Sequence, residues 1–394
     1  IFYSFSTTLG SGTMGFFAYY LTSPFLFIIA LFPRALFPLA LSIVIGLKLS
    51  LSALTMDIFL QKFCGKSAYI CSVSYGFCGY LIANSMNIMW LDVLILLPIV
   101  MLMTERLINE GRLLGYIISL AAILYLNYYI SYMVLIFVLI WFLVRVWAVK
   151  EKSPTQALYR LGIGTILAAG VNVVLLMPAF LELKNNSLIG SEATQDISVV
   201  VNNINIFQVI SKLYSLSFNS AQIYWEAPMI FCGTVIPILA LLFFINKKIP
   251  RRERVAMFVI LLLFLVTFVY ERLNLIWHVG IARAEFPYRE AIFAVFVIIV
   301  CACRSVENIK AGITKRNFIS IFMSTIVITV ALLLGNSSGI QPWKIVFNVI
   351  LIIITFVFTA LIIFGNKKPI IVLSALFLVV LQFFDLGLNA SYIY

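Results

Sequence analysis

Long runs of apolar residues, each separated from the next by a short polar break, occupy most of this chain. A helix needs roughly 20 consecutive apolar residues to cross the hydrocarbon layer of a bilayer. Twelve runs approach or reach that length, at residues 39–60, 67–83, 90–108, 113–126, 131–149, 161–181, 229–245, 255–270, 290–303, 318–335, 344–364 and 370–384. The pattern predicts an all-α integral membrane protein, a polytopic bundle of about twelve transmembrane helices.

The charged residues between these runs predict the orientation of the bundle. Lysine and arginine gather in the cytoplasmic loops of membrane proteins. Most of the 27 basic residues fall in alternate loops, at Lys62, Lys66, Arg106, Arg112, Arg145, Lys150, Lys152, Arg160, Lys247, Lys248, Arg251, Arg252, Arg254, Arg304, Lys310, Lys315, Arg316, Lys367 and Lys368. We therefore expect these loops in the cytoplasm and interpret the net charge of +12 as a topology signal, with no nucleic-acid partner.

Two segments on the opposite side stand out by their length. In the first outer loop, residues 1–38, the apolar stretch 16–33 cannot be a full crossing if the loops are to alternate. We predict that it forms one or two interfacial or re-entrant helices, broken at Pro24 and Pro33. The second long outer loop covers residues 182–228. We expect one polytopic domain over residues 1–394, and the sequence looks cut at both ends.

The composition agrees with this class of protein. Hydrophobic residues make up 63% of the chain, against roughly 45–50% in soluble domains. Charged residues make up only 11%. A concentration of charge at any one place is therefore a candidate site.

Such a concentration occurs in the outer segment 274–290, NLIWHVGIARAEFPYRE, which holds the single histidine of the chain, His278. Arginine binds phosphate through two parallel hydrogen bonds and keeps its charge, so Arg283 and Arg289, with the nearby Arg272, are candidate phosphate ligands. Glu290 follows Arg289 directly. The pair suits either a substrate site or an ion pair at the start of a helix.

His278 has two interpretations as well. It could bind the same phosphate or carry a proton near neutral pH. Alternatively, it is a hydrogen-bonded interfacial histidine beside the anchoring side chain of Trp277.

Two further candidate residues lie within the predicted spans. Asp92, at the outer start of a span, could act as a general base that activates an acceptor hydroxyl, or it could simply stabilise the first helical turn. Lys48 lies near the middle of a span, where a charge costs about 2.5–3.5 kcal/mol or more. It must face the bundle interior or a wet cavity, either against a buried partner or as a ligand for a lipid phosphate.

Asn127 and Tyr128 lie where two spans meet on the outside and are further candidates for substrate binding. Tyrosine is also common at the membrane interface for reasons of anchoring alone. The sequence indicates no cofactor and leaves the participation of a divalent metal open.

Several stretches together resemble the bacterial YfhO family of polytopic membrane proteins, whose fold is similar to the GT-C class of glycosyltransferases. They are FYSFSTTLGSG, FFAYYLTSPF, NIMWLDVLILLP, NYYISYM, APMIFCG, and LNLIWHVG followed by FPYRE. They occur in the family's order between residues 2 and 290.

The resemblance implies an enzyme of the bacterial cytoplasmic membrane with its active face outside. Such an enzyme would move a sugar from a polyprenyl-phosphate carrier to a cell-envelope acceptor such as a teichoic acid. The family's main catalytic carboxylate is expected upstream of Ile1, and an outer C-terminal region of the family is expected beyond this chain. Asp92, in the matching WLD, is then the best acidic candidate.

Two other functions remain open from the sequence. A transporter or flippase for lipid-linked sugars would explain Lys48 but would need ionisable residues in several spans. A non-catalytic envelope-assembly protein would tolerate the loss of Asp92 and Arg289.

Overall fold

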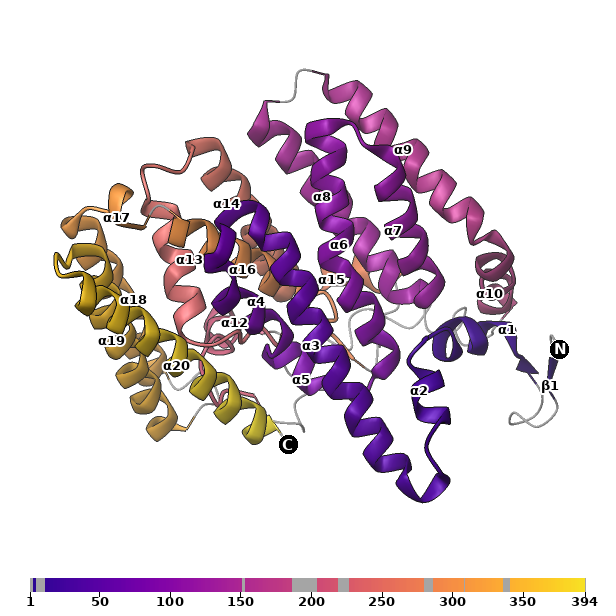
Figure 1. Cartoon of the computed structure of the whole chain (residues 1–394), viewed down its shortest axis with the longest axis horizontal. Coiled ribbons are helices and arrows are strands. Elements are labelled where there is room, and N and C mark those ends of the chain that lie inside the picture. Colours follow the sequence, from indigo (N-terminus) through magenta and orange to yellow (C-terminus); the bar gives the residue numbers. More distant parts are fainter. Residues whose placement is uncertain are drawn as a thin grey trace. The chain divides into compact units, whose positions relative to one another are not determined.

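The computed structural model of the chain describes residues 3–4, 11–150, 153–185, 204–218, 227–279, 286–307, 309–335 and 341–393. Their regular structure is helical, apart from an antiparallel pairing of Tyr3–Ser4 with Ser11–Gly12. The prediction of an all-helical membrane protein is confirmed at this level. Figure 1 shows the long helices and their order along the chain.

The helices before residue 200 begin with four short helical turns, and longer helices follow. They are α1 (Met14–Phe16), η1 (Phe17–Leu21), α2 (Leu26–Ala30), η2 (Arg34–Leu36), α3 (Phe37–Cys64), η3 (Gly65–Ala68), α4 (Tyr69–Gly76), α5 (Gly79–Ala83), α6 (Ile88–Glu110), α7 (Leu113–Leu126), α8 (Tyr128–Val149), α9 (Pro154–Val171) and α10 (Val173–Asn185).

The remaining helices follow in the second half of the chain. They are α12 (Ile206–Ser211), α13 (Val235–Ile245), α14 (Arg251–Val269), α15 (Glu271–Trp277), α16 (Ala291–Glu307), α17 (Ile309–Gly312), α18 (Lys315–Gly335), α19 (Pro342–Phe364) and α20 (Lys368–Ile393).

Six helices in the described part of the chain are long and apolar enough to cross a membrane. They are Arg34–Cys64, Ile88–Glu110, Tyr128–Val149, Lys315–Leu332, Pro342–Phe364 and Lys368–Ile393. A seventh span results if the bent pair α9 and α10 is counted as one. The other ranges predicted as spans contain shorter or more charged helices.

The chain divides into two compact units. Unit 1 consists of residues 1–55, 84–200 and 275–284, and unit 2 consists of residues 56–83, 201–274 and 285–394. Helix α3 contributes residues to both. The single domain expected from the sequence remains a prediction.

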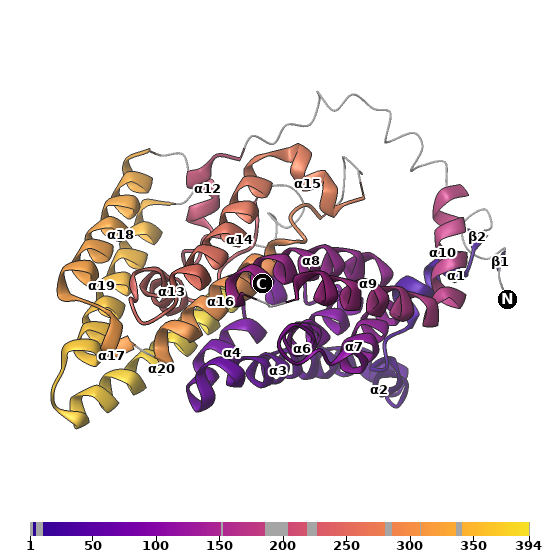
Figure 2. The same ribbon diagram turned by 90° about the horizontal axis from the view of Figure 1, so that it is seen from above.

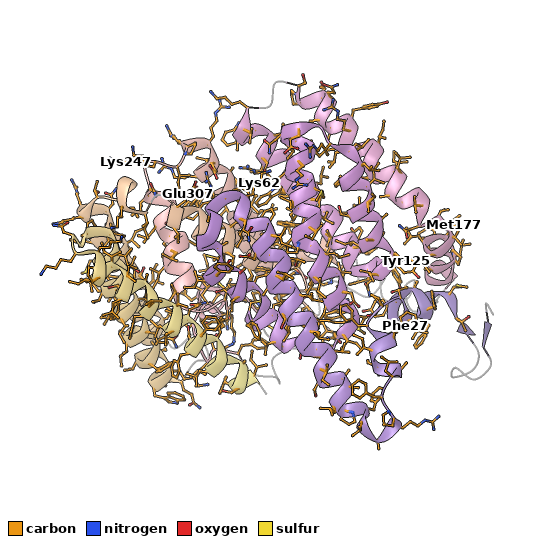
Figure 3. All side chains as sticks on the ribbon, viewed as in Figure 1. Phe27, Lys62, Tyr125, Met177, Lys247 and Glu307 are labelled. Atoms are coloured by element: carbon orange, nitrogen blue, oxygen red, sulfur yellow. A yellow bond between two sulfur atoms is a disulfide. The ribbon has the colours of Figure 1, made fainter. Side chains whose placement is uncertain are left out.

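Unit 1 is built around α6, which packs against α7, α8 and α9. Figures 1 and 2 both show α6 and α7 side by side. Close approach of α7 and α9 requires Gly164, because a Cβ there would lie 2.7 Å from the ring of Tyr116. Apolar side chains cover the outside of this unit, as Phe27, Tyr125 and Met177 illustrate in Figure 3.

In unit 2, α16 is buried along almost its whole length. It packs against α4, α13 and α14, and the ring of Phe59 on α3 lies 5.0 Å from that of Phe296. A disulfide joins Cys64 to Cys303. Helices α18, α19 and α20 pack in sequence beside α13.

Three predicted spans are broken or shortened in the structure. The range 161–181 is not straight: α9 and α10 meet at a bend of 77°. The side chain of Asn172 lies at the break and donates to the carbonyls of Ala121 and Ala168, which favours a helix end there. The range 67–83 is broken between α4 and α5.

The third difference concerns residues 229–245, where the helix begins only at Val235. Residues 227–233 are apolar but irregular, and Gly233 adopts the left-handed φ of +86°. Conversely, α20 continues to Ile393, although the apolar run was predicted to end at residue 384.

Candidate active site

The π-helical turn η1 organises one end of unit 1, where α6 and α8 begin. It packs against α6, α7 and α8. The Tyr19 hydroxyl accepts a hydrogen bond of 2.9 Å from the indole of Trp90, and the Tyr19 carbonyl accepts one of 3.2 Å from Asn127. Thr22 donates to the carbonyl of Leu126. Single π-helical turns of this kind are frequent at functional sites.

Lys48 and Asp92 form a buried ion pair beside this turn. The Lys48 ammonium donates to Asp92 Oδ2 at 2.8 Å, to the Ile88 carbonyl at 2.8 Å and to Ser23 Oγ at 3.1 Å. These three bonds use all three hydrogens of the ammonium. Phe25 lies 4.9 Å from the same nitrogen. The sequence left open whether Lys48 has a buried partner, and the structure assigns Asp92 to it.

The two oxygens of Asp92 differ. Both are buried, and Oδ1 also lies 2.8 Å from the Lys48 nitrogen. Only Oδ2 accepts a well-aligned hydrogen bond from it, and Oδ1 has no hydrogen-bond partner among the described residues. A buried carboxylate oxygen normally accepts several hydrogen bonds. Oδ1 therefore has the capacity to accept a hydrogen bond from a hydroxyl donor.

Asn127 and Tyr128 start α8 at the same end. The Asn127 side chain accepts from the amides of Tyr129 and Ile130, and its amide group donates to Tyr19. Asn127 therefore caps the N-terminus of α8, and these bonds account for its buried side chain without a ligand. The ring of Tyr128 packs against that of Tyr19 at 5.9 Å.

His278 joins the same end of unit 1. Its Nδ1 lies 3.1 Å from the hydroxyl of Tyr129, and its side chain is only 1% exposed. One turn further along α8, the hydroxyl of Tyr132 donates to the carbonyl of Ile276. The start of α8 therefore fixes the histidine close to Asn127 and Tyr128, which agrees with both interpretations of His278.

The remaining candidates in the segment 274–290, and Arg272 beside it, belong to unit 2 or lie outside the described residues. Glu290 is fully buried and accepts a hydrogen bond of 2.6 Å from Asn274. Arg289 donates to the carbonyl of Phe286. Arg272 is exposed, and Arg283 lies outside the described residues.

The tyrosine between Pro287 and Arg289 has an unusual backbone. Tyr288 adopts a φ of 62°, which is uncommon for a bulky residue. Its ring packs edge-on against Phe268. Such strain is found where the surrounding structure enforces a particular geometry.

Sequence reasoning did not single out Tyr19 and Ser23. Both belong to the stretch FFAYYLTSPF, whose apolar character indicated only a membrane-interface helix. In the part of the chain that the structure describes, no three residues of the His, Cys, Asp or Glu type are grouped as metal ligands.

Comparison with protein-family models gives a match over nearly the whole chain. The family described as "Bacterial membrane protein YfhO" matches residues 1–393. The curated proteins and the solved structures give no match. Because the family match covers nearly the whole sequence, this chain belongs to the YfhO family of bacterial membrane proteins.

Proposed function

We propose that this protein is a membrane glycosyltransferase of the bacterial cytoplasmic membrane. It takes a sugar from a polyprenyl-phosphate carrier and passes it to a cell-envelope acceptor such as a teichoic acid on the extracytoplasmic face. In this proposal the chain crosses the membrane about twelve times and has a fold similar to the GT-C class. Membership of the YfhO family supports the proposal.

The observation that carries the proposal is the state of Asp92. Its carboxylate is 2% exposed, held on one side by Lys48, and has one oxygen without a hydrogen-bond partner among the described residues. A positioned carboxylate within hydrogen-bond distance of a reacting hydroxyl can act as general base. Lys48 serves as a positioning residue, because its three hydrogens are already donated.

The chemistry follows from these positions. The acceptor hydroxyl attacks the anomeric carbon of the sugar, and its proton moves to Asp92 Oδ1. The bond between that carbon and the phosphate oxygen breaks, and its electron pair remains on the departing polyprenyl phosphate. His278, which lies against Tyr129, is the nearby candidate for hydrogen bonding to that phosphate. Arg272, Arg283 and Arg289 remain candidate phosphate ligands.

The proposal is tested by sugar transfer in cells that carry the full-length protein. We expect Asp92→Asn to lower incorporation of radiolabelled sugar into envelope polymer by about 100-fold or more, the usual contribution of a general base. The matched control is Glu105→Gln, which also removes the charge of a buried carboxylate on α6. Transfer per molecule of folded protein should persist in this control. Undiminished transfer by Asp92→Asn would overturn the assignment.

A transporter for lipid-linked sugars is the second candidate. The observation in its favour is that buried ionisable residues occur in several long helices, among them Lys48 on α3, Asp92 and Glu105 on α6, Arg145 on α8 and Asp385 on α20. Transfer by purified protein in detergent, where the two membrane faces do not exist, distinguishes an enzyme from a flippase.

A further inference from the structure

Unit 2 contains an apolar groove that the proposed reaction does not use. Its volume is about 250 Å³, and helices α13, α18 and α19 form its walls together with residues 210–214. On α13 the walls are Pro237, Ile238 and Leu241. Most of the side chains that line the groove are apolar, so an apolar ligand group suits it.

The groove opens on the outside of the helices. Leu241 of α13 and Ile328 of α18 line it, and each is 41% exposed. Helix α18 is long and apolar enough to cross a membrane, and exposed apolar side chains on such a helix face the hydrocarbon of the bilayer. A hydrocarbon chain can therefore enter sideways between α13 and α18.

One wall of the groove carries a hydroxyl pair. The Thr329 hydroxyl donates its single hydrogen to the carbonyl of Thr325. The Tyr214 hydroxyl oxygen lies 2.7 Å from that of Thr329, so Tyr214 must be the donor in this second bond. Burial raises the pKa of the Tyr214 phenol, which keeps this donor neutral. The backbone beside Tyr214 is fixed by Asn348, whose side chain accepts from the Ser215 amide and donates to the Ser215 carbonyl. The groove is therefore preformed.

A cation lies along the same face of α19. Lys344, Asn348 and Ile352 are spaced four residues apart and share one side of the helix. Ile352 lines the groove, and Lys344 lies eight residues earlier, about 12 Å away along the axis. Lys344 also belongs to the first turn of α19, where the helix dipole favours anions.

Lys344 is a mostly buried cation. The side chain is 8% exposed, its nitrogen lies 5.6 Å from the ring of Trp343 and 4.1 Å from that of Tyr392, and it hydrogen-bonds to the Tyr392 hydroxyl. Among the residues that the structure describes, no carboxylate forms an ion pair with it. A mostly buried ammonium without a carboxylate suits an anionic ligand.

We propose that this groove binds one acyl chain of an anionic phospholipid, whose phosphate lies beside Lys344. The apolar walls contact the acyl chain. Because Lys344 lies about 12 Å along α19 from Ile352, the head group lies at that distance from the part of the acyl chain held in the groove. This site does not depend on the proposed transfer reaction. It lies in unit 2, at the end of α19 opposite the basic Lys367 and Lys368.

The site can be tested with the full-length protein by photo-crosslinking. Phosphatidylglycerol with a diazirine in one acyl chain is compared with the same probe carrying a phosphatidylcholine head group. We expect phosphatidylglycerol to label peptides of α13 and α18 several times more strongly than phosphatidylcholine does. Equal labelling by the two probes, or labelling spread evenly over all apolar helices, would overturn the proposal.

Four variants separate the head group from the chain. Lys344→Gln should reduce phosphatidylglycerol labelling to the level of phosphatidylcholine, whereas Lys368→Gln, which removes an exposed lysine at the other end of the bundle, should not. Ile328→Trp fills the mouth of the groove and should suppress labelling by both probes. Met323→Trp, on another face of α18 and 53% exposed, should leave it unchanged.

Two further controls address unfolding of the variants and the contribution of a second copy of the chain to the site. The thermal midpoint of each variant in detergent shows whether a lost label reflects unfolding. If Ile328→Trp unfolds the protein, Lys344→Gln still tests the preference for the anionic head group. Labelling that disappears on dilution to monomers would show that a neighbouring copy forms the site, contrary to the proposal.

Discussion

Helix α6 carries a buried carboxylate near each of its ends, and the two are held very differently. Glu105 accepts two hydrogen bonds from the guanidinium of Arg145, at 2.7 and 3.0 Å, and one of 2.9 Å from the Trp141 indole. Asp92 accepts a well-aligned bond from Lys48 through one oxygen only. Both carboxylates are almost fully buried, so burial alone does not distinguish a structural charge from a reactive one.

The difference lies in how completely each carboxylate is satisfied. A bidentate arginine, with the indole in addition, occupies both oxygens of Glu105 and leaves little room for a ligand. At the other end, the partner is a lysine, which is a single point charge. Tyr19, Trp90 and Tyr129 surround that end with hydroxyl and indole groups. We therefore infer that the Glu105 end fixes the fold and the Asp92 end performs the chemistry.

The largest expected effect, on sugar transfer, comes from replacing the two buried ion pairs of α6 by apolar residues. These pairs are Glu105 with Arg145 and Asp92 with Lys48. A buried ion pair can often be replaced by hydrophobic residues of similar volume without loss of stability. We expect Glu105→Leu with Arg145→Met to fold and to transfer sugar at close to the parent rate. Lys48→Met with Asp92→Leu should also fold but should lose transfer by about 100-fold or more.

This comparison is measured by sugar incorporation and by the thermal midpoint of the same purified samples. Equal loss of transfer in both double variants would show that the two ends of α6 do not differ in function. Loss of folding in the Lys48 and Asp92 double variant alone would show that this pair is required for the structure. Either result contradicts the distinction.

Removing only the cation of the ion pair between Glu105 and Arg145 should have the next largest effect, a loss of stability. Arg145→Ala leaves the Glu105 carboxylate buried without its cation, and we expect a loss of about 3–5 kcal/mol in the free energy of unfolding. Arg112→Ala is the control, because Arg112 pairs with Glu110 at the exposed end of the helix. An exposed pair contributes only about 0–1 kcal/mol. Denaturant unfolding in detergent compares the two variants, and equal losses would contradict the structural role of Glu105.

The long helices could be predicted from the sequence because apolar length is a local property. The range 113–126 agrees with α7 at both ends, where Arg112 and Asn127 interrupt the apolar run. The end of α20 could not be predicted in this way. Gln382, Asp385 and Asn389 look like loop residues, but they are buried and bond to residues 74, 216, 232, 234 and 235 of the chain.

The same polar side chains explain why residues 227–233 are not helical. Gln382 donates to the Cys232 carbonyl, and Asp385 accepts from the Thr234 amide and hydroxyl. A Cβ on Gly233 would lie 1.9 Å from the Gln382 side chain. These contacts join positions about 150 residues apart, so the apolar composition of the segment carries no sign of them.

The candidate site shows the same limit. Asp92 and Lys48 could each be selected from the sequence, because a charge in an apolar helix is costly and demands a reason. Their pairing could not, since it joins residues 44 positions apart on different helices. Tyr19 could not be selected from the sequence for another reason. It holds Trp90 and Asn127 through hydrogen bonds of a single helical turn, and the pattern of apolar residues gives no indication of these bonds.

The smallest expected effect concerns the indole that completes the Glu105 end. Trp141→Phe removes one hydrogen bond to a charged group and keeps most of the ring, and we expect a loss of about 1.5–3 kcal/mol in the free energy of unfolding. Sugar transfer by the folded protein should not change. Trp147→Phe, in the same helix and 48% exposed, is the control and should leave stability nearly unaltered. If Trp141→Phe instead lowered transfer and left unfolding unchanged, the Glu105 end would take part in the reaction, and satisfaction of hydrogen bonds would not separate the two carboxylates of α6.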